Sequence, residues 1–506
     1  MDFLKAKGKS LTLGNHSFFL RGVGLGGWLS PEGYIWKLNG REDRPRRIEA
    51  LVESLCGKDY SNSFWTNYYD IFIQEDDFAW LARWGFNSVR LPFNSRHLLE
   101  KDGLNPDYLS HIDDAVRWSK KYGLLLFLDC HGAPGGQTGT NIDDSENDYP
   151  ALFGNPENER RLLLLWRLLA ERYKDEPAIG GFDLLNEPIT HWHPDIYPQL
   201  VPLYRRLIKE IRTIDPNHLL ILEGTHWATD FSVFSELSLA EAQDNLMFEF
   251  HKYWSAPDRN SLTPYLSFRQ KYEIPLFDGE SGENNLYWYS LLFPLLEREN
   301  ISWSFWTFRK MGNPNSLSSF AVPKRWNEVI SYCKNGKIPV NPASIFNSFL
   351  DSLSGARFHP VTARSILRLA PTLIPAESFD EAKTSNHLPN QIDFRKEEKV
   401  HIVFADGHSG LPNYANYAGE PQKKSDDLLI VLQKKDEVSY YFKALEKRIH
   451  ILVLGKGNFS IFIDGIKRKN DSEVILEARI QKHTITLRGV EGESRIGSLI
   501  LAKEGV

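Results

Sequence analysis

The chain has 506 residues, of which 42% are hydrophobic and 25% are charged, and its formal net charge is −6. This length exceeds one ordinary domain and is enough for a barrel with an accessory module. The absence of a basic surplus argues against nucleic acid or an anionic membrane surface as a partner. The three cysteines lack the spacing of a metal site or a disulfide framework, so we expect no metal and no cofactor.

The N-terminal residues 1–9 contain neither the apolar run nor the small-residue cleavage site of a signal peptide. No run of about eighteen apolar residues predicts a membrane-spanning helix. These features favour a cytoplasmic protein, and secretion would require a leader that had been removed. Oligomeric state has no signature in the sequence.

The first glycine-rich stretch follows a predicted hairpin over residues 11–20. It reads Arg21-Gly-Val-Gly-Leu-Gly-Gly-Trp28 and contains the G-x-G-x-x-G pattern of dinucleotide sites. No helix and no ribose-binding acid follow it, so we interpret it as a first barrel strand whose glycines allow close packing. The loop after it carries Glu32. The alternative, a dinucleotide enzyme, predicts binding of NAD or FAD.

From about residue 75 to residue 307, short apolar strands alternate with amphipathic helices. Helices are predicted at 75–84, 111–122, 157–173, 197–214 and 287–299. Eight alternating units predict a parallel α/β fold of the TIM (β/α)8 type, with a doubly wound sheet as the alternative. The predicted strands lie near Leu25 or end near Arg90, His131, Glu187, Glu223, His251, Glu280 and Trp306.

The pattern changes after about residue 310. Two closing helices are predicted, and the segment 371–375 then marks a boundary. Beyond it, short β-type runs alternate with turn residues, which predicts an all-β sandwich of jelly-roll type with a hairpin turn at Asp464-Gly465. The predicted domains are therefore a catalytic barrel over 1–370 and a β-sandwich over 371–506.

Two of the predicted strands end on glutamates. The stretch 180–188 ends at Asn186-Glu187 and is broken by Pro188, and the strand 274–278 is followed by Gly279-Glu280. A single strand-end glutamate is as readily a helix cap or a solvated side chain. Two of them, about ninety residues apart at one end of a barrel, match the protonated acid and ionised nucleophile of a retaining glycosidase. We expect roughly 5–5.5 Å between their carboxyl groups.

Other strand ends carry groups with a use in such a site. Arg90 is suited to hold Glu280 ionised, Asn186 to reach a sugar 2-hydroxyl, and Trp306 to form the floor of a subsite. The 14 Trp, 20 Tyr and 30 Phe also fit a carbohydrate binder, because aromatic rings stack on the apolar faces of sugars. The predicted donors that orient a hydroxyl or a carboxylate are His131, Asn186, His251 and Tyr253.

Six motifs in order resemble glycoside hydrolase family 5, in the clan of retaining (β/α)8 glycosidases, and they span most of residues 15–335. The resemblance implies that Glu187 is the acid/base and Glu280 the nucleophile, with Glu283 a rival only through its proximity. It also implies a supporting shell of Arg90, His131, Asn186, His251, Tyr253 and Trp306. The motifs are Ser88-Val-Arg-Leu-Pro92, His131-Gly-Ala-Pro-Gly135, Leu185-Asn-Glu-Pro188, Phe250-His-Lys-Tyr253, Gly279-Glu-Ser-Gly-Glu283 and Trp303-Ser-Phe-Trp306.

The stretches 21–32 and 131–139 are similar to the exo-β-1,3-glucanase branch, in which an acid at the Glu32 position grips the terminal glucose. Cys130 and the loop 141–148 differ from that branch. Exo action on β-glucosides or β-glucan is favoured; the alternatives are an endo-β-1,4-glucanase, a β-mannanase or a glycolipid β-glucosidase of the same family. A non-catalytic carbohydrate-binding protein is the alternative from another class. The C-terminal domain resembles carbohydrate-binding modules of families 6 and 35, with a purely structural sandwich as the other interpretation.

Overall fold

The computed structural model describes the chain except residues 1, 39, 385–391, 470–472, 478–481 and 504–506. The chain forms two compact units. The first comprises Met1–Lys252, Pro264–Ser281 and Asn300–Phe358, and the second Tyr253–Thr263, Gly282–Glu299 and His359–Val506. The predicted domain ranges 1–370 and 371–506 stay a prediction about independent folding, because compactness groups two segments of the barrel sequence with the C-terminal part.

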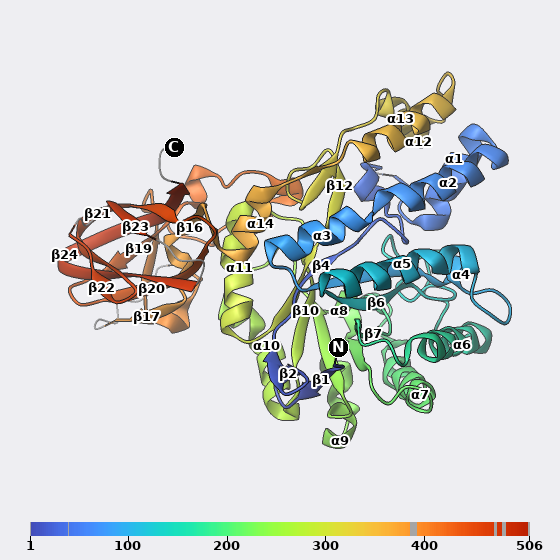
Figure 1. Cartoon of the computed structure of the whole chain (residues 1–506), viewed down its shortest axis with the longest axis horizontal. Coiled ribbons are helices and arrows are strands. Elements are labelled where there is room, and N and C mark those ends of the chain that lie inside the picture. The colour runs from blue at the N-terminus through green and yellow to red at the C-terminus, as the bar shows by residue number, and fades with distance from the viewer. Residues whose placement is uncertain (1, 39, 385–391, 470–472, 478–481, 504–506) are drawn as a thin grey trace. The chain divides into compact units, whose positions relative to one another are not determined.

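Eight parallel strands close into a barrel in the order β10-β11-β4-β5-β6-β7-β8-β9 (Figure 1). The predicted (β/α)8 fold is confirmed, and the doubly wound alternative is wrong because the sheet has no edges. The strands are β4 Arg21–Gly24, β5 Ser88–Asn94, β6 Leu125–Gly132, β7 Ile179–Asp183, β8 Leu219–Glu223, β9 Leu246–His251, β10 Leu276–Gly282 and β11 Ser302–Trp306.

The glycine-rich stretch forms β4 and the loop after it, as interpreted from the sequence. A Cβ atom on Gly24 or on Gly26 would lie 2.6 Å from ring carbons of Trp306. Glycine at both positions therefore lets the Trp306 ring lie directly against the first strand. The stretch has a packing role, which removes the motivation for the dinucleotide alternative.

Helices connect the barrel strands, and their ends follow local capping signals. Asn105 caps α5 by accepting hydrogen bonds from the next backbone N–H groups, Pro106 occupies the first turn, and Gly123 ends the helix at φ 70°. The connecting helices are α3 Glu75–Trp84, α5 Pro106–Tyr122, α6 Pro156–Tyr173, α7 Leu200–Arg212, α10 Arg259–Tyr272 and α11 Leu286–Arg298, with the short α4 Ser95–Leu98, α8 Thr225–Ala228 and α9 Leu239–Ala242.

One connecting helix was missed in the sequence. α10 contains Pro264 in its interior and lacks a regular apolar stripe, so its pattern does not predict a helix. Helices and small sheets outside the barrel complete the first unit. They are α1 Pro45–Cys56, α2 Lys58–Phe72, α12 Trp326–Asn335 and α13 Pro342–Ser354, with the sheets β1 Leu4–Lys7, β2 Ser10–Leu13 and β3 His16–Phe18, and β12 Arg309–Met311, β13 Ser318–Phe320 and β14 Arg357–Phe358.

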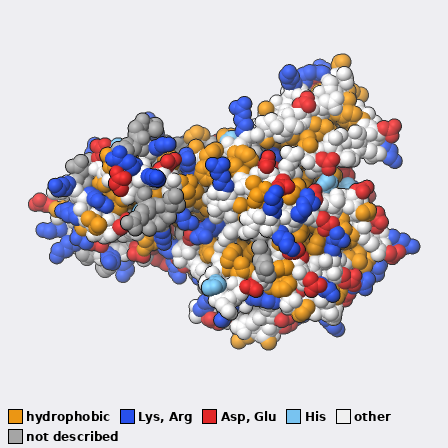
Figure 2. All heavy atoms as spheres, viewed as in Figure 1, with side chains coloured by type: hydrophobic (Ala, Val, Ile, Leu, Met, Phe, Trp, Pro, Cys, Tyr) orange, Lys and Arg blue, Asp and Glu red, His pale blue; other side chains and the backbone are white. Residues whose placement is uncertain are grey.

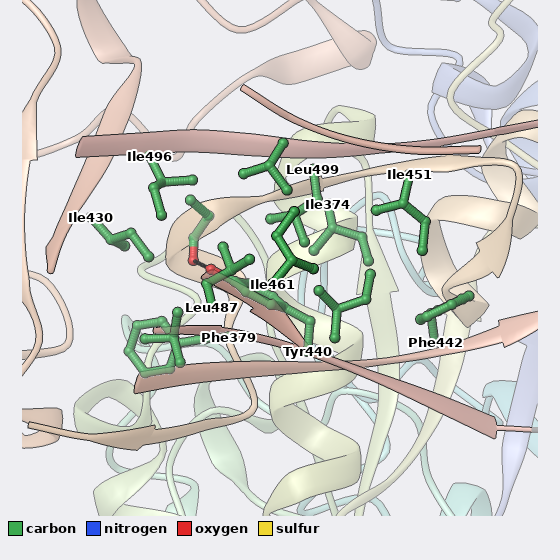
Figure 3. Close-up of a cluster of buried hydrophobic side chains, with 14 of the residues drawn as sticks. Ile374, Phe379, Ile430, Tyr440, Phe442, Ile451, Ile461, Leu487, Ile496 and Leu499 are labelled. Atoms are coloured by element: carbon green, nitrogen blue, oxygen red, sulfur yellow. Dashed lines mark hydrogen bonds between the residues drawn. The ribbon is translucent and has the colours of Figure 1, made fainter. Parts of the chain in front are cut away.

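The second unit is rich in β-strands, as predicted, and also holds α11 and α14 Pro360–Leu367. Its strands enclose a core of aliphatic and aromatic side chains, part of which Figure 3 shows around Tyr440 and Ile461. The strands are β15 Leu369–Ala370, β16 Thr372–Pro375, β17 Glu381–Lys383, β18 His401–Phe404, β19 Leu428–Leu432, β20 Glu437–Ala444, β21 Arg448–Ile463, β22 Ile466–Lys467, β23 Glu473–Glu477 and β24 Lys482–Lys503.

Two of these strands are longer than the predicted runs. The runs 449–453 and 459–463 both lie in β21, and the runs 484–487 and 496–500 both lie in β24, because register shifts bend the paired strands without ending them. The predicted Asp464-Gly465 turn is confirmed between β21 and β22, with both residues at positive φ.

No helix in the described part of the chain is long and apolar enough to cross a membrane. On the face shown in Figure 2, acidic and basic side chains are interspersed.

Candidate active site

Arg90 on β5 is the centre of a buried polar cluster in the first unit, with 1% of its surface exposed. Its Nη1 donates to Glu280 Oε1 at 2.6 Å, and its Nε donates to Asp183 Oδ2 at 2.9 Å. Its Nη2 donates to Asn186 Oδ1 at 2.8 Å and to Glu223 Oε1 at 3.0 Å. One guanidinium therefore joins residues from β5, β7, β8 and β10 and from the loop after β7.

The two predicted catalytic glutamates lie close together. His251, at the end of β9, places its Nδ1 2.5 Å from Glu187 Oε1 and 3.5 Å from Glu280 Oε2. One side-chain oxygen of each glutamate and a ring nitrogen of His251 all lie within 4.8 Å of one another. This separation is below the ~6.5–9.5 Å between the carboxyl groups of inverting glycosidases. Glu187 is 7% exposed and Glu280 4% exposed, so bulk water is largely excluded from both carboxyl groups.

The backbone of Glu187 is held in an uncommon conformation. Its φ is 44°, in the left-handed region that costs a non-glycine residue roughly 1–2 kcal/mol. Its N–H donates to Glu223 Oε2 at 2.6 Å, and its carbonyl accepts a hydrogen bond from Thr138 Oγ1 at 2.7 Å. These contacts stabilise the strained backbone, and strain of this kind is typical of functional sites.

The position of Glu280 depends on an irregularity in β10. The pairing of β10 with β9 shifts register between Asp278 and Glu280, which places Glu280 opposite His251. A Cβ atom on Gly279 would lie 1.5 Å from Oε1 of Glu249, so only glycine fits here without displacing that side chain. The Gly-Glu sequence at this strand end is thus a steric requirement of the site.

Burial and neighbouring charges set the protonation of the site. Burial raises the pKa of Glu187 to about 7, although the positive charges of His131 and Arg90 oppose this shift. Burial also lowers the pKa of His251 to about 3, so its imidazole is neutral at pH 7. Burial alone would lower the pKa of His131, but Asp129 and other carboxylates outweigh it and raise that pKa to about 9. A half-protonated Glu187 at neutral pH is suited to give and take a proton.

Sequence reasoning missed a set of buried carboxyl groups around Arg90. Burial raises the pKa of Asp183 to about 7 and the pKa values of Glu223 and Glu249 well above their usual range. One guanidinium cannot balance several buried negative charges, so Glu223 and Glu249 are protonated at neutral pH. The available signal was an acidic residue within, or at the end of, an apolar strand. The set is Asp129, Asp183, Glu223 and Glu249.

His131 and Trp306 lie against each other. Their rings are parallel within 8°, with centroids 5.6 Å apart, and His131 Nδ1 lies 2.9 Å from Asp129 Oδ2. Trp306 Nε1 donates to the hydroxyl of Tyr34 at 2.6 Å, a contact that the sequence did not predict. Glu32 is 3% exposed, and its charge is among those that raise the pKa of His131, so it lies near the same group.

Two residues named from the sequence belong to the second unit. Tyr253 is half-buried there, and its ring centroid lies 5.2 Å from that of Trp254. Glu283, the rival nucleophile, is also in the second unit, where its carbonyl accepts a hydrogen bond from Trp254 Nε1 at 2.8 Å. The Arg90 cluster of the first unit contains Glu280 instead, and the role of Tyr253 stays a prediction.

Three groups of side chains have donor atoms close enough together to bind a metal ion. Each combines an imidazole with two carboxylates, a donor set that suits zinc. Arg90, however, already donates to Glu280 and Glu223, and its positive charge opposes a second cation at the same oxygens. The groups are Asp129–His131–Glu280, Glu187–His251–Glu280 and Glu223–Glu249–His251.

Comparisons with known proteins agree with this geometry. A β-xylosidase from Phanerodontia chrysosporium is 29% identical over 352 residues, which cover 62% of this chain and 72% of that protein. Endoglucanase C from Acetivibrio thermocellus is 28% identical over 317 residues, covering 49% of this chain and 87% of that protein. A probable glucan 1,3-beta-glucosidase A from Emericella nidulans is 31% identical over 240 residues, covering 46% of this chain and 57% of that protein.

The profile of the cellulase family, glycosyl hydrolase family 5, matches residues 53–312. This match contains the strands β5 to β11, which bear Arg90, Glu187 and Glu280. Because it spans more than half of the 506 residues, the chain belongs to glycosyl hydrolase family 5 and is a β-glycoside hydrolase.

Proposed function

We propose that this enzyme is a retaining, exo-acting β-glucosidase or β-glucanase in which Glu187 is the acid/base and Glu280 the nucleophile. The observation that carries the proposal is the placement of the two carboxyl groups, with one oxygen of each within 4.8 Å and His251 Nδ1 near both. At this separation a carboxylate reaches the anomeric carbon directly and leaves no room for the water of an inverting mechanism.

The reaction proceeds in two steps. The carboxylate of Glu280 attacks the anomeric carbon, the bond from that carbon to the leaving oxygen breaks, and Glu187 gives its proton to that oxygen. In the second step Glu187 removes a proton from water, the resulting hydroxide attacks the anomeric carbon, and the ester bond to Glu280 breaks. Arg90 binds Glu280 at 2.6 Å and stabilises the carboxylate as it leaves.

Two buried donors are available to the sugar hydroxyls. Among the described residues, Asn186 Nδ2 and His131 Nε2 have no hydrogen-bond partner, although both are buried. A buried donor without a partner costs about 1–3 kcal/mol, which a substrate hydroxyl would recover. Asn186 directly precedes the acid and is assigned to the 2-hydroxyl, and Trp306 beside His131 is assigned to the floor of the subsite.

Exo action rests on Glu32 and on the names of two relatives. Glu32 is buried near His131 and is assigned to the terminal sugar. A β-xylosidase and a glucan 1,3-beta-glucosidase are both named for single-sugar release, which favours the exo mode and makes a β-xyloside a second candidate substrate. An endoglucanase is a relative as well, so the substrate panel includes β-1,4-glucans, β-mannans and glucosylated lipids.

The first test removes the nucleophile. Glu280→Ala should abolish hydrolysis of an aryl β-glucoside, and added azide should restore turnover with the α-linked glycosyl azide as product, because azide attacks from the face that the carboxylate has vacated. Glu283→Ala, three residues along the chain, is the matched control and should retain activity. Near-normal hydrolysis by Glu280→Ala would remove Glu280 from the mechanism.

The same preparation serves a substrate screen followed by NMR. A retaining enzyme releases the β-anomer first from a β-glycoside, and an exo enzyme releases single sugars from the start of the reaction. Initial release of the α-anomer would contradict the retaining mechanism, and early release of mixed oligosaccharides would contradict exo action.

A further inference from the structure

A group of exposed aromatic rings lies on two loops of the first unit. His191 and Trp192 follow β7, and His226 and Trp227 follow β8. The centroid of Trp227 lies 5.1 Å from that of Trp192 and 5.4 Å from that of His191, and the centroids of His191 and His226 are 4.9 Å apart. Trp192 is 49% exposed, unlike the many aromatic side chains of the core. These four residues are called the loop aromatic cluster.

Hydrogen bonds tie both loops to the residues around the acid. His226 N donates to Ile189 O at 2.7 Å, and Ile189 N donates to Gln137 O at 3.0 Å. Gln137 Nε2 donates in turn to Asn186 O at 3.0 Å. Trp192 lies five residues beyond Glu187, so its Cα is at most about 18 Å from that of the acid. The cluster is therefore at the same end of the barrel as the catalytic pair and follows the proton donor directly.

The β8 loop holds its two rings on a rigid and strained turn. His226, Trp227 and Ala228 have φ values of 56°, 54° and 61°, three successive non-glycine residues in the left-handed region. Thr225 and Asp230 close the turn with two backbone hydrogen bonds of 3.0 Å. Strain of this kind persists only where the surrounding structure enforces it, and it is concentrated at ligand-binding and active sites.

The chemistry of the cluster suits a sugar. Trp192 and Trp227 meet edge to face at 75°, and in such a pair the ring that offers its edge keeps both faces clear of its partner. An indole face stacks on the apolar C–H face of a sugar ring, and an imidazole binds its hydroxyls. Burial, and then the nearby His191, lower the pKa of His226, so this ring is uncharged at neutral pH.

We propose that the loop aromatic cluster is a binding platform for the sugar units of the leaving group. This inference rests on the proposed function: Glu187 protonates the leaving oxygen, so the leaving group lies on the side of Glu187, from which the chain runs directly to His191 and Trp192. The cluster would thus favour β-linked disaccharides and longer oligosaccharides over glycosides with a small leaving group.

The test compares a β-glycosyl fluoride, whose leaving group is one atom, with the β-linked disaccharide and trisaccharide of the same sugar. Trp192→Ala should lower the ratio of kcat/KM for the oligosaccharides to kcat/KM for the fluoride by about tenfold, the order expected for the loss of one ring contact. Trp192→Phe keeps an aromatic face and should retain most of the ratio. Trp227→Ala should lower the ratio in the same direction.

Trp84→Ala is the matched control. Trp84 ends α3, which leads into the N-terminal end of β5 and so lies at the opposite end of the barrel from the strand C-termini. Its ratio should equal that of the wild type. Ratios within twofold of wild type for both Trp192→Ala and Trp227→Ala would overturn the platform. If Trp227→Ala proves unfolded, the exposed Trp192 decides alone. A wild-type enzyme that cleaves the fluoride and none of the oligosaccharides would also overturn the platform, whereas one that cleaves no glycoside would overturn the proposed function.

Discussion

Three side chains of the site differ in proton affinity because their surroundings differ. Burial raises the pKa of Glu187 to about 7 and lowers that of His251 to about 3. His131 is equally buried, but Asp129 and other carboxylates raise its pKa to about 9. At neutral pH the site thus contains a cationic His131, a neutral His251 and a Glu187 that is poised to exchange a proton.

The pH dependence of activity follows from the pKa of Glu187. The acid is active while protonated, so kcat/KM for a β-glycoside with a poor leaving group should fall as the pH rises through about 7. In Glu187→Gln, a substrate with an activated aryl leaving group needs no proton and should show no such alkaline limb. Pre-steady-state and steady-state rates from pH 5 to pH 9 measure both. An alkaline limb that persists in Glu187→Gln would assign it to another group.

At the scale of the elements, side chains at the ends of neighbouring strands hold the acid in place. Glu223 ends β8 and bonds both Arg90 and the N–H of Glu187, so it connects the guanidinium that binds Glu280 with the strained backbone of the acid. Charges of Asp183 and Glu249 add to the burial that keeps Glu223 protonated. We therefore interpret Glu223 as a positioning residue for Glu187.

Substitutions of Glu223 should separate its two contacts. Glu223→Ala removes both acceptor oxygens and should lower kcat by about 100-fold, the order expected when a catalytic group moves by about 1 Å. Glu223→Gln keeps one acceptor oxygen and should lose about tenfold. Kinetics with the pH profile of Glu187, together with thermal unfolding, test this. Equal losses in the two variants would show that a negative charge on Glu223, and not its hydrogen bonding, is required.

At the scale of the whole molecule, the β-rich part stabilises a helix of the barrel sequence. α11 follows the strand that bears Glu280, yet Leu291 of this helix packs in the core of the second unit. Tyr287 hydrogen-bonds Glu377, and Arg298 pairs with Glu398 at 3.0 Å within the same unit. These contacts favour the structural interpretation of the C-terminal part, while its resemblance to carbohydrate-binding modules stays a prediction.

Truncation after residue 370 should therefore fail to give an active barrel. The shortened chain keeps α11 but loses the side chains that cover Leu291, and it should aggregate or unfold at a lower temperature than the full chain. Leu291→Ala in the full chain is the milder variant and should cost about 2–5 kcal/mol of stability in the second unit. A soluble truncated enzyme with wild-type kcat/KM and melting temperature would show that the predicted boundary separates independent domains.

The sequence by itself determined the elements and the chemical types at their ends. Strand periodicity and strand-end residues predicted the barrel, the β-rich C-terminal part and the family, because these signals are local. α10 was missed because Pro264 and an irregular apolar pattern conceal it. The union of two predicted runs in β21 was missed because bulges do not interrupt strand pairing.

Only the tertiary structure decided which side chains meet. Barrel closure and the register shift beside Gly279 place Glu280 opposite His251, and these depend on pairing between strands far apart in the chain. The acids around Arg90 and the grouping of α11 with the C-terminal strands are decided in the same way. Local patterns carry no information about such contacts, because packing between distant segments sets them.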